Sequence, residues 1–318
     1  MVRVVYHASH EQFAPSALLD LVGLAGAAGF DGAKCSNHFR PWRPGGQSGH
    51  AWPWLGAALA RTAFPVGVIS APGYRYHPAV LAQGAATLAE MFPGRFWLAL
   101  GSGQRLNEDV TGVAWPEKAE RNAWLRECAG VIRALLEGET VTHRGRVTVV
   151  EARLHSRPAT PPPLLGAAVT PATAREVGAW ADGLLTVAGE AGAVREVVEA
   201  YREGGGRGRL VLQAGLSWAR TDAEAERNAH EEWRYAALGG EVNWELRRPE
   251  DFDTATRRVR PEDMRESPLV TADMGWLAGR LGELAALGFD EVHLHNVGPN
   301  QAEFVEAAGR DLLPALRG

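Results

Sequence analysis

The chain has 318 residues, of which 46% are hydrophobic and 22% are charged, and its formal net charge is -5. This composition is typical of a folded globular chain and excludes a disordered one. The acidic balance argues against nucleic acid as a partner, because nucleic-acid-binding proteins usually carry a basic surplus. The two cysteines, Cys35 and Cys128, lie far apart in the sequence, which argues against a disulfide scaffold and favours a cytoplasmic protein.

The N-terminal residues lack the apolar run and cleavage pattern of a signal peptide. No stretch approaches the roughly 18 consecutive apolar residues of a membrane span. We therefore expect no membrane partner.

Short apolar runs alternate with helical patterns along the whole chain. Strands are expected at residues 2–6, 33–35, 66–69, 96–100, 164–168, 184–187, 210–216 and 291–295. Helices are expected at about 16–28, 54–62, 78–91, 118–136, from 171, at 193–202, 274–287 and up to 316. Apolar and polar residues alternate over about 140–155 on either side of a glycine, which predicts a hairpin insertion. A second insertion, polar and helical, is expected at about residues 221–270.

Eight strands that alternate with helices predict an α/β protein, a single (β/α)8 TIM barrel spanning residues 1–318 with these two insertions. The rival is an open doubly wound sheet. Against it, no G-x-G-x-x-G turn follows the first strand, and the chain contains no GxxxxGK[ST] loop.

In a barrel the active site lies at the carboxyl ends of the strands. His38 follows the second strand and is the best candidate for acid or base chemistry, because histidine titrates near neutrality. A buried histidine that bonds a backbone carbonyl is the structural alternative. The turn Gly101-Ser102-Gly103 follows the fourth strand. Its backbone N–H groups could face a phosphate or the edge of a ring system. The alternative is that the glycines only allow a tight turn with positive φ. Glu108, just beyond it, suggests a helix N-terminal acid.

His293 and His295 lie two residues apart on the last strand and therefore share one face. Such a pair can bind zinc, but no carboxylate-plus-histidine set completes the site. We expect pocket-lining histidines and no metal, and keep a zinc-dependent barrel hydrolase as an alternative.

Several motifs, in order, resemble the luciferase-like flavin- and F420-dependent oxidoreductases. They include Ser36-Asn37-His38-Phe39-Arg40-Pro41-Trp42 and Gly101-Ser102-Gly103-Gln104-Arg105-Leu106-Asn107-Glu108, with shorter matches at 9–15, 75–79, 91–95 and the end of the last strand. They look like the F420-dependent glucose-6-phosphate dehydrogenase branch, and most closely like its sister group of non-F420 flavin oxidoreductases. The resemblance implies a dimeric barrel with a flavin or deazaflavin ring at its mouth, which performs hydride transfer or monooxygenation.

In that branch an Asp-His pair follows the second strand, where this chain has Asn37 and His38, and a Glu acts as acid or base where this chain has Gln104. The resemblance also implies a ring-buttressing bulge at Val68-Ile69-Ser70. The branch uses two lysines for its sugar phosphate, and these positions are here Glu190 and Thr254. A carboxylate there would repel a phosphate, so we expect glucose 6-phosphate to be excluded.

The resemblance and the strand ends together give the expected site. The catalytic residues are His38, Trp42 and Gln104. The cofactor contacts are Asn37, Val68, Ile69, Ser70, Gly101, Ser102, Gly103, Asn107, Ala168, Val169 and Val187. The substrate pocket contains His7, Glu190 and His295. The expected cofactor is FMN or F420, with FMN slightly preferred.

The first functional hypothesis is an FMN- or F420-dependent oxidoreductase, a homodimer that acts on an unknown small molecule. The second is a flavin-binding barrel with weak or no catalysis, because Asn37 and Gln104 carry amides and cannot exchange protons.

Overall fold

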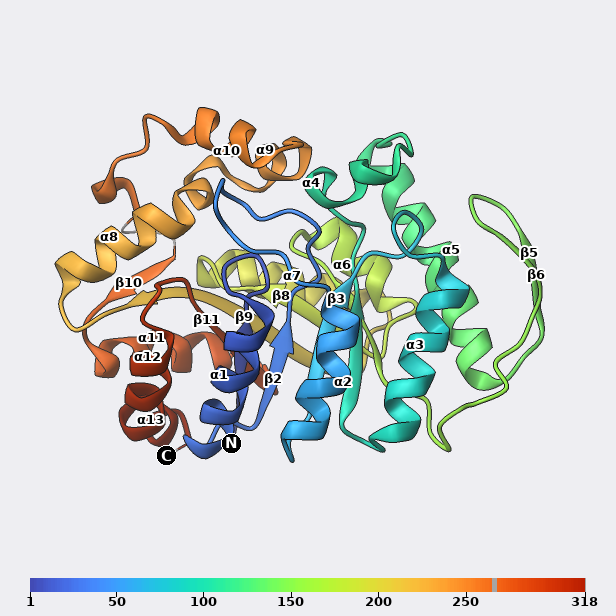
Figure 1. Ribbon diagram of the computed structural model, residues 1–318, viewed down its shortest axis with the longest axis horizontal. Coiled ribbons are helices and arrows are strands. Elements are labelled where there is room, and N and C mark those ends of the chain that lie inside the picture. The colour runs from blue at the N-terminus through green and yellow to red at the C-terminus, as the bar shows by residue number, and fades with distance from the viewer. Residues whose placement is uncertain (265–267, 318) are drawn as a thin grey trace.

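The computed structural model describes residues 1–264 and 268–317. In this part of the chain eight parallel strands close into a barrel with helices around it (Figure 1). The barrel strands are β1 (Arg3–Ala8), β2 (Gly32–Cys35), β3 (Val66–Ser70), β4 (Phe96–Leu100), β7 (Leu164–Ala167), β8 (Gly183–Val187), β9 (Arg209–Trp218) and β11 (Glu291–Asn296). They are neighbours in this order, and β11 pairs with β1. The predicted (β/α)8 barrel is therefore confirmed.

Outer helices connect consecutive strands of the barrel, namely α1 (Pro15–Ala27), α2 (Ala51–Arg61), α3 (Pro78–Met91), α5 (Lys118–Glu137), α6 (Pro171–Gly178), α7 (Ala191–Glu203) and α11 (Met274–Ala285). After the last strand follow α12 (Gln301–Ala307) and α13 (Leu313–Arg317). None of the helices described is long and apolar enough to cross a lipid bilayer.

Side chains alternate along each strand between the outer helices and the lumen, as the period of two requires. The outward residues join the large core under the helices. One side of the lumen is filled by a separate apolar cluster of Trp97, Ala99, Leu165, Leu185 and Val211. Inward positions of β1, β2, β9 and β11 carry polar side chains, namely His7, Lys34, Gln213, His293 and His295. The lumen is thus apolar on one side and polar on the other.

The two insertions lie at different places on the barrel. The hairpin of β5 (Val141–Arg144) and β6 (Thr148–Ala152) packs beside α5 and projects to the right in Figure 1. The second insertion contributes α8 (Asp222–Trp233), α9 (Gly240–Glu245) and α10 (Pro249–Thr256), which lie above the barrel in the same view. A small core of Trp42, Leu106, Tyr235 and Phe252 fixes this insertion to the carboxyl end of the barrel.

Some elements differ from the sequence prediction. Strand β1 continues to Ala8, which places His7 within the strand rather than after it. Strand β9 continues to Trp218 because β10 (Leu269–Thr271) pairs with its end. The helix α4 (Arg105–Glu108) and β10 were not predicted; β10 lies at the end of the polar stretch of about 221–270 that was assigned to the helical insertion.

Candidate active site

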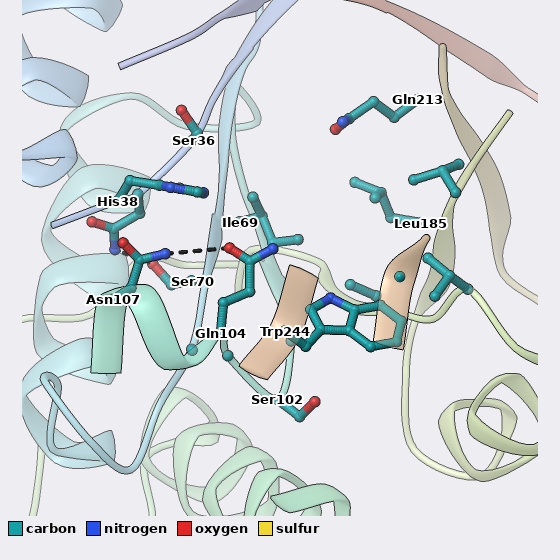
Figure 2. Close-up of a pocket in the computed structure, with 18 of the residues that line it drawn as sticks. Ser36, His38, Ile69, Ser70, Ser102, Gln104, Asn107, Leu185, Gln213 and Trp244 are labelled. Atoms are coloured by element: carbon teal, nitrogen blue, oxygen red, sulfur yellow. Dashed lines mark hydrogen bonds between the residues drawn. The ribbon is translucent and has the colours of Figure 1, made fainter. Parts of the chain in front are cut away.

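The carboxyl ends of the barrel strands surround a cavity of about 650 Å³. This volume lies within the roughly 300–1,000 Å³ of small-molecule sites. Most of the expected site residues line it: His7, Asn37, His38, Trp42, Ile69, Ser70, Gly101, Ser102, Gly103, Gln104, Asn107, Ala168, Val169, Val187 and His295. In Figure 2, His38, Gln104 and Trp244 reach toward the same space from different sides.

Two of the expected residues lie outside the cavity lining. Val68 is fully buried in the outer core, because the alternation of β3 turns it toward the helices and turns Ile69 toward the lumen. Glu190 is exposed and caps α7, where its carboxylate accepts a hydrogen bond from the Ala193 N–H at 3.0 Å. Neither side chain therefore lines the cavity.

Burial lowers the pKa of His38 below its usual 6.5, and the Glu11 carboxylate only partly opposes this effect. The imidazole is therefore neutral at neutral pH and is suited to accept a proton. Its ring lies 5.0 Å from the ring of Trp42, centroid to centroid. The indole Nε1 of Trp42 is buried and has no hydrogen-bond partner among the described residues. A proton acceptor and an unused donor thus lie side by side at the cavity.

The side chain of Asn37 hydrogen-bonds to residues other than His38. Its Nδ2 donates to Ser70 Oγ at 2.7 Å, and its Oδ1 accepts from the Tyr76 hydroxyl at 3.1 Å. Its backbone carbonyl accepts from the Arg75 guanidinium at 2.7 Å. These bonds fix the backbone that carries His38 and link the ends of β2 and β3.

The His38 loop is held from the other side by Asn107. The Asn107 Oδ1 accepts hydrogen bonds from the backbone N–H groups of Phe39 and Arg40 at 2.9 and 3.3 Å. Its Nδ2 donates to Gln104 Oε1 at 3.3 Å, the dashed line in Figure 2. The amides of Asn107 and Gln104 therefore organise the loop as well as line the cavity.

The glycine turn after β4 is constrained at Gly103. This residue has φ of +86°, and a Cβ built on it would lie 2.9 Å from Glu108 Cγ and 3.3 Å from Ala71 Cβ. A Cβ on Gly101 would meet only ordinary contacts. The tight-turn explanation therefore applies to Gly103, while Gly101 remains free to approach a ligand.

The structure adds cavity residues that sequence reasoning missed. They are Glu11, Lys34, Arg75, Lys118, Arg121, Gln213, Trp233 and Trp244, among others. Lys34 and Gln213 occupy inward positions in the middle of strands, so a rule based on strand ends passes over them. The one feature of the sequence that could have pointed to this part of the site is Lys34, a lysine inside an otherwise apolar strand. Trp233 and Trp244 belong to the insertion, whose position over the mouth no local pattern reveals.

Glu108 is not simply a helix N-terminal acid. Its carboxylate pairs with the Arg75 guanidinium at 3.1 and 3.2 Å, and both side chains are almost fully buried. Burial raises the pKa of Glu108, although Arg75 acts in the opposite direction. The pair joins the loop after β3 to α4.

The two histidines of β11 both face the lumen, as their spacing predicted. His293 Nε2 lies 2.9 Å from Glu291 Oε2, and His295 Nε2 lies 2.9 Å from Gln12 Oε1. Burial lowers the pKa of each to about 4. No group of three or more potential ligands for a metal occurs among the described residues. The zinc-hydrolase alternative thus finds no ligand set in this part of the chain.

Residues 2–291 match the family model described as luciferase-like monooxygenase. The chain belongs to the luciferase-like monooxygenase family. It is 36% identical over 330 residues to a protein of Nakamurella multipartita named F420-dependent glucose-6-phosphate dehydrogenase, with 99% of this chain and 97% of the relative covered. A protein of the same name from Microbacterium testaceum is 33% identical, with 99% and 98% covered.

Among solved structures, the fold matches an F420-dependent secondary alcohol dehydrogenase in complex with an F420-acetone adduct. The TM-score is 0.92 at 26% identity, and 100% of this chain and 99% of that chain are covered. The family expected from the sequence motifs is confirmed, and the chain is an oxidoreductase of the luciferase-like family. The slight preference for FMN is not supported, because the names of these relatives carry F420. The exclusion of glucose 6-phosphate also loses its support, since Glu190 lies outside the cavity lining and two relatives carry that sugar phosphate in their names.

Proposed function

We propose that this luciferase-like protein is an F420-dependent oxidoreductase that takes a hydride from a small hydroxyl compound. The observation that carries the proposal is the pairing of a neutral His38 with the unused Trp42 indole N–H at the wall of the cavity. The names of the relatives support F420 over FMN.

The cavity fits a flat ring that carries an anionic side chain. Ile69 and Leu185 offer apolar surface to a ring face, and Gly101 allows close approach of the backbone. Lys118 and Arg121 provide cations in the lining, where a phosphate-bearing side chain of the cofactor would bind.

When bound, the cofactor ring would supply the site that accepts the hydride. His38 accepts the proton of the substrate hydroxyl, because its neutral imidazole has a free basic nitrogen at neutral pH. Trp42 Nε1 donates a hydrogen bond to the same oxygen and keeps it oriented. Trp233 and Trp244 of the insertion add apolar surface to the cavity wall.

The test is a titration of the purified protein with F420 and with FMN, followed by incubation with secondary alcohols and with glucose 6-phosphate. We expect micromolar or tighter binding of F420, and loss of its visible absorbance with at least one hydroxyl compound. Binding without reduction by any of them would instead favour the flavin-binding barrel without catalysis. Absence of binding of either cofactor would refute the proposal.

The homodimer and the cytoplasmic location remain predictions. Sedimentation of the purified protein at several concentrations tests the first, and a monomer throughout would contradict it.

A further inference from the structure

Lysine is nearly absent from the chain, whose 33 basic residues include only two lysines, Lys34 and Lys118. Both line the cavity. Every other cationic position carries arginine, so these two sites retain a compact ammonium where a planar guanidinium would otherwise be used. Lys118 Nζ lies 5.5 Å from the ring centroid of Trp244 in the insertion. Lys34, in contrast, is completely buried in the barrel lumen.

The Lys34 ammonium has an incomplete set of acceptors. Its Nζ donates to Gln213 Oε1 on β9, and this is its only hydrogen bond to the described residues. An ammonium carries three N–H donors, so two of them remain unused. The nearby carboxylate of Glu11 accepts a hydrogen bond from Ser36 Oγ and forms no ion pair with Lys34. Glu11 still helps to keep the lysine charged, because it opposes the effect of burial, which lowers the pKa of Lys34 to about 8.

His7 lies directly beside Lys34, since the register of β1 and β2 pairs the two residues. The side chain is 3% exposed, and neither ring nitrogen has a hydrogen-bond partner among the described residues. Burial, together with the charge of Lys34, lowers the pKa of His7 well below 6.5, so the ring is neutral and offers one N–H donor. A buried polar group without a partner is energetically unfavourable. The inner end of the cavity therefore concentrates unused donors around one cation.

We propose that Lys34 and His7 form a subsite for a delocalised anion with oxygen acceptors at the inner end of the cavity. The anion has two possible sources with the same chemistry. One is a carboxylate of the substrate, and the other is the pyrimidine edge of the cofactor ring in its reduced form. Only the second source rests on the proposed function.

The first experiment addresses the cofactor. Oxidised and reduced F420 are titrated anaerobically into the wild type, Lys34→Met and Lys34→Gln. If the ring supplies the anion, each variant lowers the affinity for reduced relative to oxidised F420 at least tenfold, which corresponds to ~30 mV for a two-electron couple. Lys118→Met is the matched control, because this second lysine contacts Trp244 and should change both affinities by the same factor.

The second experiment needs no cofactor. Protein labelled with ¹⁵N at lysine gives two ammonium resonances, which Lys118→Met assigns. If the substrate supplies the anion, glycolate or pyruvate shifts the Lys34 resonance saturably in the millimolar range and leaves that of Lys118 in place. Gln213→Glu keeps the lysine but places a carboxylate against its ammonium, so it should abolish the shift and the redox preference even where Lys34→Met does not fold.

The outcomes separate the two sources. A carboxylate-dependent shift without binding of F420 refutes the proposed function and supports a substrate subsite. If the Lys34 variants change the affinity for reduced relative to oxidised F420, and glycolate and pyruvate leave the Lys34 resonance in place, the anion belongs to the cofactor ring. If neither glycolate nor pyruvate shifts Lys34, and the affinity ratio of the wild type survives in the Lys34 and Gln213 variants, the subsite does not exist.

Discussion

At the scale of single residues, the chemistry depends on whether His38 is neutral. Its pKa lies below 6.5 in the folded protein, because burial disfavours the charged ring. As base, the histidine is active above its pKa, so kcat/KM should rise with pH below 6.5 and reach a plateau above it. His38→Ala should lose about 10²–10⁴-fold in turnover and should abolish the acid limb. The melting temperature, measured alongside, distinguishes this role from a structural one: an equal loss of folding and activity contradicts it.

Gln104 stands where the related branch has a glutamic acid, and its Oε1 is used by Asn107. Gln104→Glu should introduce an ionisation above the ordinary ~4.3, because the cavity wall partly desolvates the new carboxyl group. The wild type should show no ionisation from this position. The measurement is a pair of pH–rate profiles. Superimposed profiles would place Gln104 away from the chemistry.

At the scale of elements, the buried pair of Arg75 and Glu108 joins the loop after β3 to α4. Arg75→Met leaves an uncompensated buried carboxylate and should reduce the free energy of unfolding by about 3–5 kcal/mol. The double variant with Glu108→Met should recover most of that loss, since it removes both charges. Urea unfolding of the two variants tests this. Activity should remain impaired in both, because the bond from Arg75 to the Asn37 carbonyl is lost; full activity of the double variant would show that this anchor is dispensable.

At the scale of the whole molecule, the buried histidines make the fold sensitive to acid. The pKa values of His10, His293 and His295 are lowered to about 4, with burial as the largest cause. Between pH 6.5 and about 4 the unfolded chain binds more protons than the native one, so stability falls as the pH is lowered through this window. Each such histidine contributes about 1.4 kcal/mol per pH unit.

Thermal melting at several pH values between 7 and 4.5 tests this expectation. His10→Asn should flatten the dependence, because it removes one of the titrating groups outside the cavity lining. A melting temperature that does not change over this range would contradict the prediction.

The sequence by itself determined the barrel, because its strands and helices are specified by local apolar patterns. It also located His38, Trp42 and the glycine turn, since the carboxyl ends of all strands in a parallel barrel meet at one mouth. Only the tertiary structure decided what these residues contact. Asn37 hydrogen-bonds to Ser70 and Tyr76, which a linear motif does not reveal, and Glu190 caps a helix outside the cavity lining.

The inner end of the cavity was also decided by the tertiary structure alone. Lys34 and Gln213 lie 179 positions apart in the sequence, and the closure of the barrel brings their side chains together across its lumen. The insertion reaches the site in the same way, through the packing of Tyr235 and Phe252 against Trp42. Local patterns fix which face of a strand is polar, but only the closed barrel fixes which polar faces meet, because that depends on contacts between residues distant in the chain.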